Sequence, residues 1–455
     1  MGRFQKIKNT AKRGIFATFA LLMAATVFPA QALAATSTQS IALPLYEYPT
    51  VGTLWSDVQT AGGSQVPFAI VNPASGPGVS ANSDYTTAIG NNTTAGIRSI
   101  GYVDTNYQSR AYTDVIADVD TWYTLYPDVT GIFLDRVSAV GATELCYSSY
   151  IYNYIKTRHP TALVSQNFGT YASPSYEPYG DIFVNAEMDH TLYQTWVLPA
   201  DGFQDNAANS NRFWHLIHTT NGADLSSTLT QTRNNNAGWV YITDDILPNP
   251  YNATPSYWSS LLTGVGTLPA SSIPNRGVTQ LPAGCADVDS AVSSSTTIGT
   301  QQTVTANTVT LTNSSGTYIA QTPMKVAFSL PSGVSVQNAS GSGWTCTGNE
   351  CSYTSSLAAG SSAPDLTAEF AVSCSYDSGD ATVTTTNFAG NASSDLVALT
   401  APSDCPTGSG GGSQSGGSSA ENLAGTGADA VLVTIFGLGL VAFGGVVLRR
   451  FAGRT

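Results

Sequence analysis

The chain has 455 residues with a formal net charge of −13, and only 10% of its residues are charged. This length is too great for one ordinary domain, and the low charge density with abundant glycine, serine and threonine indicates an extracellular protein in several parts. A chain so acidic lacks the basic surface that phosphate binding requires, so nucleic acid is excluded as a partner.

The N-terminal segment has the order of a secretory signal peptide. Five basic residues lie within the first 13 positions, an apolar run spans 15–27, and the small residues Ala32 and Ala34 follow. We expect cleavage near Ala34, which makes residues 1–34 the signal peptide. An uncleaved membrane anchor is the alternative, but the apolar run is short for a helix that crosses a bilayer.

From Ile41 to about Gly266, strand-like apolar runs alternate with helical patterns. This alternation is typical of repeated βα units around a parallel sheet. Eight runs in about 240 residues match the size of a (β/α)8 TIM barrel, which we place at residues 36–275. The eight predicted strands are Ile41–Tyr48, Pro67–Asn72, Ile97–Val103, Gly131–Asp135, Ala162–Asn167, Asp181–Glu187, Phe213–His218 and Gly238–Asp244.

The clearest helices are expected over Tyr112–Tyr126 and Thr143–His159, where apolar residues recur on one face. An open doubly wound sheet is the alternative α/β class. It would carry a glycine-rich phosphate turn after the first strand, and no such turn follows Tyr46–Pro49. The barrel is therefore the predicted fold of this region.

Each predicted strand ends in or next to a polar residue. In a TIM barrel the C-terminal strand ends and their loops converge on one face, where active sites lie. The pattern therefore predicts a site built from side chains at these ends. They are Glu47, Asn72, Asp104, Asp135, Asn167, Glu187, His218 and Asp244.

Asp135 is the first candidate for chemistry, because it ends an apolar strand that begins at Gly131. A strand-end aspartate also caps helices or pairs with a neighbouring cation, here Arg136. Glu187 ends the sixth predicted strand, two strands further along the same rim. The start of an acidic loop is the alternative role of Glu187, since Asp189 follows it.

From about Leu281 to Cys405 the sequence changes to serine, threonine and valine in alternation. Such period-two runs predict an antiparallel β-sandwich of seven or eight strands over residues 281–405. The stretches 330–334 and 343–346 resemble the immunoglobulin-like, DUF11-like modules of bacterial surface proteins. We expect a spacer, with glycan binding as the alternative role.

Six cysteines follow the signal peptide, and disulfides are the expected state in an exported chain. Only Cys346 and Cys351 indicate a partner, because a short turn-like segment separates them. Cys146 is the lone cysteine of the predicted barrel, and we expect it to be a buried thiol on a helix.

The C-terminal region has three parts in a fixed order. A flexible Gly/Ser linker occupies 406–422, the pentapeptide 423–427 follows, and an apolar run at 428–448 is long enough to cross a bilayer before a basic tail. This order resembles the LAxTG form of the cell-wall sorting signals of Gram-positive bacteria, over residues 423–455.

The resemblance to a sorting signal implies that a sortase cleaves between Thr426 and Gly427 and joins the chain to peptidoglycan. The expected location is then the cell wall of a Gram-positive bacterium, outside the cell. A tail-anchored membrane protein is the alternative.

Removing both ends makes the chain more acidic. Eight of the 17 basic residues and one of the 30 acidic residues lie in the signal peptide and the tail, which leaves 9 positive and 29 negative charges over 35–426, a net of −20. This field suits a cationic partner such as a partly deacetylated amino-sugar polymer, although acidity also keeps exported proteins soluble.

The barrel region, from residue 41 to about 266, contains several short motifs that together resemble a known family. They are Leu45–Pro49, Val71–Pro73, Ser75–Gly78, Gly101–Tyr107 with Arg110, Gly131–Asp135, Tyr241–Asp244 and Pro255–Trp258. These motifs resemble the spherulation-specific family 4, or spherulin-4-like, proteins. Some members of that family are glycoside hydrolases of family 135 that cleave polymers of galactosamine and N-acetylgalactosamine.

The resemblance implies catalytic roles for Asp135 and Glu187, which match the family's acids at the ends of the fourth and sixth strands. Arg136 stands where the family has a second acid beside the first. A guanidinium group there would lower the pKa of Asp135 if it pointed toward that carboxylate, and would have little effect if it pointed into the barrel wall.

Glycoside hydrolysis usually needs one carboxyl group that donates a proton and a second that acts as base or nucleophile, about 5 to 9.5 Å away. We expect Asp135 and Glu187, two strands apart on one rim, to lie within this range. No metal and no cofactor is expected. The predicted sugar-binding residues are Glu47, Asn72, Tyr102, Asp104, Tyr107, Arg136, Asn167, His218 and Asp244.

The first hypothesis is therefore a wall-anchored glycoside hydrolase that acts inside a galactosamine-containing polysaccharide. The alternative is a glycan-binding adhesin that uses the same barrel mouth without cleavage. A third possibility is a structural surface protein whose barrel does neither.

Overall fold

The computed structural model describes residues 39–139, 141–283, 285 and 288–405. The predicted signal peptide, the linker and the sorting signal with its apolar run 428–448 lie outside the described residues. In the described part of the chain, no helix is long and apolar enough to span a membrane.

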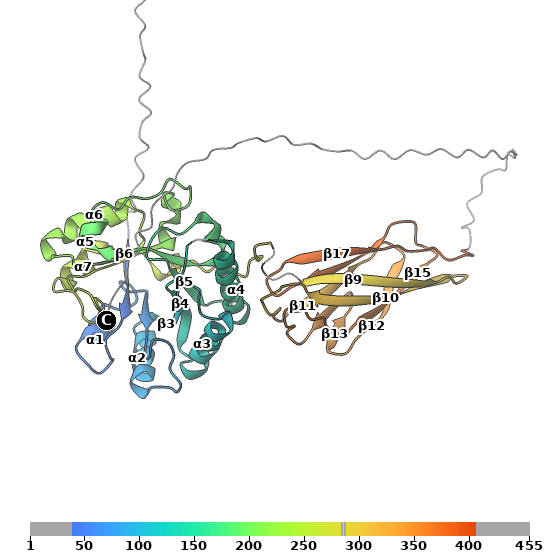
Figure 1. Cartoon of the computed structure of the whole chain (residues 1–455), viewed down its shortest axis with the longest axis horizontal. Helices are drawn as coiled ribbons and strands as arrows, with labels where there is room; N and C mark the ends of the chain where they lie inside the picture. The colour runs from blue at the N-terminus through green and yellow to red at the C-terminus, as the bar shows by residue number, and fades with distance from the viewer. Residues whose placement is uncertain (1–38, 140, 284, 286–287, 406–455) are drawn as a thin grey trace, which may run out of the picture. The chain divides into compact units, whose positions relative to one another are not determined.

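Eight parallel strands form a closed barrel in chain order, because β1 pairs with β2 on one side and with β8 on the other (Figure 1). All eight predicted strands are confirmed. Their apolar residues are buried on both faces, as expected for parallel strands covered by helices. The strands are β1 (Ser40–Leu45), β2 (Phe68–Val71), β3 (Arg98–Asp104), β4 (Val129–Asp135), β5 (Leu163–Asn167), β6 (Ile182–Asp189), β7 (Phe213–His218) and β8 (Trp239–Ile242).

Helices surround the barrel (Figure 1). The two predicted amphipathic helices correspond to α3 (Tyr112–Leu125) and α4 (Ala142–Arg158) and are confirmed. The other α-helices are α1 (Leu54–Ala61), α2 (Ser83–Thr94), α5 (His190–Tyr193), α6 (Leu225–Asn234) and α7 (Trp258–Val265). Short 3-10 turns lie at Pro174–Tyr179, Ala207–Arg212, Gly222–Asp224 and Ala270–Ser272.

Large aromatic side chains fill the barrel interior. Phe68 on β2 contacts both Trp214 on β7 and Trp239 on β8, with ring centroids 5.1 Å apart in each pair. Phe133 on β4 lies 5.9 Å from Trp214. These edge-to-face contacts join strands that are not neighbours in the sheet. The interior is a packed core, so a ligand must bind at one end of the barrel.

The register of β4 sets the position of Asp135. Gly131 pairs with Leu163 on β5, and a Cβ atom on Gly131 would lie 2.3 Å from the Leu163 carbonyl oxygen. A side chain at this position would push the strands apart. On the other side of β4, Asp135 pairs with Asp104 at the end of β3. Glycine therefore allows the close strand packing that brings these carboxylates to one rim.

A buried ion pair lies at the opposite end of the barrel. The Nζ atom of Lys156 on α4 is 2.6 Å from the Oδ2 atom of Asp181, and neither side chain is exposed to solvent. Asp181 also accepts the backbone N–H groups of Val164 and Arg276, each at 2.8 Å. Lys156 donates to Asn275 at 3.0 Å. The pair thus joins α4, β5 and the segment after the barrel.

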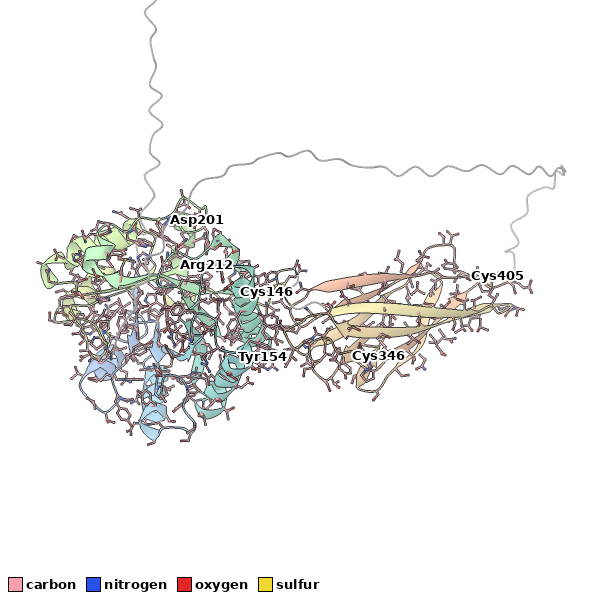
Figure 2. All side chains as sticks on the ribbon, viewed as in Figure 1. Cys146, Tyr154, Asp201, Arg212, Cys346 and Cys405 are labelled. Atoms are coloured by element: carbon pink, nitrogen blue, oxygen red, sulfur yellow. A yellow bond between two sulfur atoms is a disulfide. The ribbon has the colours of Figure 1, made fainter. Side chains whose placement is uncertain are left out.

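The expectation for Cys146 is wrong. Cys146 lies on α4 (Figure 2) and forms a disulfide with Cys285, with the two Cα atoms 5.1 Å apart. Cys285 comes 139 residues later, beyond the predicted end of the barrel. No local sequence pattern marks the return of that segment to α4, so the free thiol was the wrong inference.

Residues 288–397 form two antiparallel sheets, with the orders β12-β15-β10-β9 and β13-β14-β11-β16-β17. Phe328 of one sheet and Phe370 of the other pack with ring centroids 5.3 Å apart. This region has nine strands, where the sequence predicted seven or eight. The immunoglobulin-like assignment stays a prediction. The strands are β9 (Val288–Thr297), β10 (Gln302–Asn313), β11 (Met324–Ser329), β12 (Val334–Ser340), β13 (Trp344–Thr347), β14 (Glu350–Tyr353), β15 (Leu366–Ser373), β16 (Ala381–Thr386) and β17 (Ala392–Val397).

Two disulfides lie in this all-β region. The predicted bond between Cys346 and Cys351 is confirmed, and these residues are register partners on β13 and β14. The other bond joins Cys374 to Cys405. Figure 2 labels Cys346 and Cys405.

Replacing Lys156 by methionine should destabilise the barrel strongly. The substitution leaves Asp181 buried without a counter-charge, and loss of one partner of a buried pair costs about 3–5 kcal/mol. We expect the free energy of unfolding to fall by about this amount in chemical denaturation followed by tryptophan fluorescence.

Lys325→Met is the matched control for this experiment. Lys325 pairs with Glu350 at 2.9 Å, but 43% and 50% of the two side chains are exposed. Loss of such a surface pair changes stability by about 1 kcal/mol or less. Equal effects of the two substitutions would contradict the role assigned to the buried pair.

Candidate active site

A pocket of about 180 Å³ lies at the carboxyl ends of the barrel strands. Its walls include the carboxylates of Asp135 and Glu187, the amide of Asn167 and the phenols of Tyr46 and Tyr251. We call it the central pocket. The other residues of its walls are Pro44, Tyr107, Phe133, Arg136, Phe168, Gly169 and Leu216.

One side-chain amide joins the two carboxylates. The Nδ2 atom of Asn167 donates to the Oδ1 atom of Asp135 at 2.8 Å and to the Oε2 atom of Glu187 at 2.7 Å. Because both oxygens bond to the same nitrogen, they lie at most 5.5 Å apart. The structure therefore brings together the two acids that the sequence nominated, and β5 between them supplies the bridge.

The orientation of the Asn167 amide is fixed by the turn that follows β5. Its Oδ1 atom accepts the backbone N–H of Gly169 at 2.8 Å. This bond to the residue two positions on is an Asx turn, and Gly169 has a φ of +63°, which glycine adopts without strain. With the oxygen held there, the NH2 group must face the carboxylates.

Each carboxylate also has a tyrosine hydroxyl of its own. Tyr102 on β3 donates to the Oδ2 atom of Asp135 at 2.8 Å, and Tyr251 donates to the Oε1 atom of Glu187 at 2.8 Å. Tyr46 packs edge-on between the two rings, with centroid distances of 6.1 Å to Tyr102 and 5.9 Å to Tyr251. The pair is therefore held by phenols on both sides.

Burial raises the pKa of Asp135 above its ordinary value, although the hydrogen bonds from Tyr102 and Asn167 act in the opposite direction. Burial also raises the pKa of Glu187, and the negative charge of Asp135 raises it further. Two charges this close in a poorly hydrated site repel each other. The close approach therefore opposes ionisation of both groups at once.

Arg136 points away from Asp135. Its Nε atom donates to the Oδ1 atom of Asp104 at 2.7 Å, and its Nη2 atom donates to the other oxygen of that carboxylate. The guanidinium group also lies 5.7 Å from the ring centre of Tyr107. The pKa of Asp135 is raised by burial and not lowered overall, and the Arg136 guanidinium group contacts Asp104 instead of the barrel wall.

The charge of Arg136 acts on Asp104. Partial burial tends to raise the pKa of Asp104, but the hydrogen bonds from Arg136 and from the Asn106 backbone outweigh it, and the pKa is lowered. The two acids at the ends of β3 and β4 thus have pKa values shifted in opposite directions. Only Asp135 lines the central pocket.

Three of the predicted sugar-binding residues hold loops and are absent from the walls of the central pocket. Glu47 accepts the backbone N–H of Leu54 at 3.1 Å, at the start of α1. Asn72 accepts the N–H of Gly76 at 2.9 Å, and Asp244 accepts that of Ser256 at 3.1 Å. Their polar groups meet local backbone needs, which a strand-end pattern cannot distinguish from ligand binding.

The other predicted binding residues lie at or near the mouth. Tyr107 and Arg136 line the central pocket, and His218 lines a neighbouring one. Within the described residues, no group of three His, Cys, Asp or Glu side chains is placed to hold a metal ion.

Sequence reasoning missed Tyr46 and Tyr251. The first had a usable signal, because Pro44 faces the pocket and alternate strand residues share a face. This alternation places Tyr46 on the same face as Pro44, toward the pocket, and Glu47 on the opposite face. Tyr251 lies in the long loop after β8, where no periodicity applies, and only the fold brings its hydroxyl to Glu187.

Comparison with known proteins identifies the family. Spherulin-4 of Physarum polycephalum is 35% identical over 246 residues, an alignment that covers 52% of this chain and 73% of that protein. The family described as spherulation-specific family 4 matches residues 40–265. The chain belongs to this family. The resemblance inferred from the barrel motifs is confirmed.

Two solved structures are similar to the spherulation-specific family 4 barrel of this chain. Aspergillus clavatus Sph3, in complex with GalNAc, has 23% identity and a TM-score of 0.42, with 51% of this chain and 98% of that chain covered. The Bacillus cereus spore cortex-lytic enzyme SleL has 10% identity and a TM-score of 0.35, with 51% and 75% covered.

Replacing Asp135 by asparagine should stabilise the protein as the pH rises. Asparagine still accepts from Asn167, and the Tyr102 hydroxyl accepts in place of donating, so the hydrogen bonds persist. A carboxyl group whose pKa is raised by folding loses its stabilising contribution as the pH rises through that pKa. We expect the Tm of Asp135→Asn to exceed that of the wild type by a margin that grows between about pH 4 and pH 7.

Asp104→Asn is the control of opposite sign. The pKa of Asp104 is lowered by folding, so its contribution to stability is present above its ordinary pKa and is lost as the pH falls. The Tm of this variant should drop below that of the wild type as the pH rises. Margins of the same sign for both variants, or margins independent of pH, would contradict the assigned pKa directions.

Proposed function

We propose that this protein is a glycoside hydrolase that cleaves a polysaccharide containing galactosamine or N-acetylgalactosamine. The observation that carries this proposal is the pair of carboxylates bridged by Asn167 at the barrel mouth, with oxygens at most 5.5 Å apart. Two carboxyl groups with separate protonation states are the minimum requirement for this chemistry.

The pKa shifts suggest a division of roles. Burial and the charge of Asp135 both raise the pKa of Glu187, which suits this residue to act as the general acid that donates to the glycosidic oxygen. Asp135, ionised and hydrogen-bonded by Tyr102 and Asn167, is the nucleophile at the anomeric carbon. After the leaving sugar departs, Glu187 as a carboxylate takes a proton from the water that releases the product.

The separation of the carboxylates favours retention of configuration. Retaining glycosidases hold the two groups about 5–5.5 Å apart, whereas inverting enzymes need about 6.5–9.5 Å to admit a water molecule. The shared amide of Asn167 keeps the facing oxygens within the shorter range. A covalent intermediate on Asp135 is the route that this spacing allows.

The substrate class rests on the family and on charge. Members of the family with hydrolase activity resemble this chain in the barrel motifs, and they act on galactosamine polymers. The net charge of −20 over residues 35–426 attracts a polymer with free amino groups. The order of the N-terminal and C-terminal segments supports export and anchoring to a Gram-positive cell wall by a sortase, where such a polymer is accessible.

Arg136 favours a second candidate function, a glycan-binding adhesin. It occupies the position where the family has a second acid, and it lines the central pocket while bonded to Asp104. If that acid is indispensable for bond cleavage, the same pocket binds the sugar without cutting it. Retention on the polymer without new reducing ends would identify this function.

Replacing either carboxylate should abolish hydrolysis while the fold persists. Purified protein is incubated with acetylated and partly deacetylated galactosamine polymers, and new reducing ends are measured. Glu187→Gln removes the proton donor and should lower the rate about 10²–10⁴-fold, and Asp135→Asn should lower it at least as far. Asp244→Asn is the matched control, because this strand-end acid caps a loop outside the central pocket and should retain full activity. Loss of activity in the control alone would refute the assignment.

The first product should have the configuration of the substrate. Proton NMR of the anomeric region, recorded before mutarotation, distinguishes the two outcomes. An inverted product would show that the carboxylates work through a water molecule, and would contradict the role of Asp135 as nucleophile.

A further inference from the structure

A second pocket adjoins the central pocket on the side of Glu187. It has a volume of about 500 Å³ and shares Tyr46, Glu187 and Tyr251 with the central pocket, whereas Asp135 lines only the central one. An acid that protonates a glycosidic oxygen lies between the attacked sugar and the leaving sugar. If Glu187 is that acid, as the proposed function requires, the second pocket lies on the leaving side.

A third pocket of about 520 Å³ extends this line. It shares His218 and Leu247 with the second pocket. Its walls include three exposed apolar side chains, Leu192, Ile246 and Leu247, with 59%, 65% and 66% of their surface accessible. Apolar side chains gathered beside a polar groove mark a binding surface. They can pack against the C–H faces of sugar rings, which are the apolar part of a polysaccharide.

His218 stands at the junction of the second and third pockets, with 8% of its surface exposed. Its Nδ1 atom lies 2.9 Å from the Oγ1 atom of Thr219, and among the described residues no group bonds to its Nε2 atom. Burial lowers the pKa of His218, although the charge of Asp189 acts to raise it. A neutral imidazole with one free nitrogen offers one hydrogen bond to a sugar hydroxyl.

The neighbouring amide is held by the loop. Asn249 lines the second pocket, and its Nδ2 atom donates to the Tyr46 carbonyl at 3.2 Å while its Oδ1 atom accepts the Tyr251 N–H at 3.2 Å. Asn249 lines only the second pocket, whereas His218 is the polar residue that lines both pockets.

We propose that the second and third pockets bind two consecutive sugar units on the leaving side of the cleaved bond. His218 donates or accepts one hydrogen bond at their junction, and Leu247 packs against the rings. The ligand is an amino-sugar oligosaccharide that continues from the central pocket. This inference rests on the proposed function, because Glu187 defines which side the leaving sugar occupies.

The test uses galactosamine and N-acetylgalactosamine oligosaccharides of increasing length, labelled at the reducing end. After cleavage the label stays with the leaving fragment. Filling of both pockets predicts that the shortest abundant labelled product contains two sugar units. A labelled monosaccharide as the main product would overturn the inference.

Two substitutions separate binding in these pockets from general damage. His218→Ala and Leu247→Asp should each lower kcat/KM for long oligosaccharides about tenfold, the effect of one lost contact. Both should affect cleavage of an aryl glycoside less, because an aryl leaving group enters the second pocket without reaching the third. Leu396→Asp, at a position 71% exposed on β17, is the matched surface control. Equal losses on both substrates would overturn the inference.

A binding measurement on a variant that does not cleave the sugar tests the two pockets independently of the proposed hydrolase activity. In the Glu187→Gln background, calorimetry should show affinity rising with oligosaccharide length and falling about tenfold on addition of His218→Ala. If the wild type releases no product, the proposed hydrolase fails, and this length dependence still decides whether the pockets bind sugar. Affinity independent of length and of His218 would overturn the inference.

Discussion

The site depends on one side-chain amide that serves two carboxylates. Asp135 and Glu187 lie on strands separated by β5, and without a donor between them their oxygen atoms would face each other with no hydrogen-bond partner. Asn167 gives one N–H to each, and its oxygen is anchored to the Gly169 backbone, so the amide cannot turn its acceptor toward the acids. The spacing of the two acids follows from this arrangement.

The rest of the barrel makes that arrangement rigid. Aromatic rings of Phe68, Phe133, Trp214 and Trp239 fill the interior below the mouth, so the strand ends cannot move inward. The buried pair of Lys156 and Asp181 fastens the opposite end. Side chains at strand ends are held in more precise positions than side chains on loops, because the strands are fixed by the packed core. The packed core is thus part of the catalytic geometry.

Features with a local signature were predictable from the sequence. Buried parallel strands are apolar along their length, and this pattern predicted the barrel. A polar residue follows each apolar run, and this made Asp135, Asn167 and Glu187 candidates for the site. The antiparallel region was predictable from the alternation of polar and apolar residues along its strands. Glu47 does not line the central pocket, because a residue at a strand end faces either the pocket or the outside, and Pro44 and Tyr46 take the pocket side of β1.

Features made by distant segments were not predictable. Tyr251 reaches Glu187 from 64 positions away, and Cys285 reaches Cys146 from 139. The bond between Arg136 and Asp104 depends on the register of β3 against β4, which no single strand encodes.

That last bond also limits which single substitutions this rim tolerates. Arg136 donates to Asp104, and the Arg136 carbonyl accepts the Tyr107 N–H at 2.7 Å, so one residue joins two loops through both its side chain and its backbone. An acid at position 136 would place two like charges side by side, and a neutral residue at position 104 would leave the guanidinium group without its partner. A change at either position is therefore best tolerated together with a compensating change at the other.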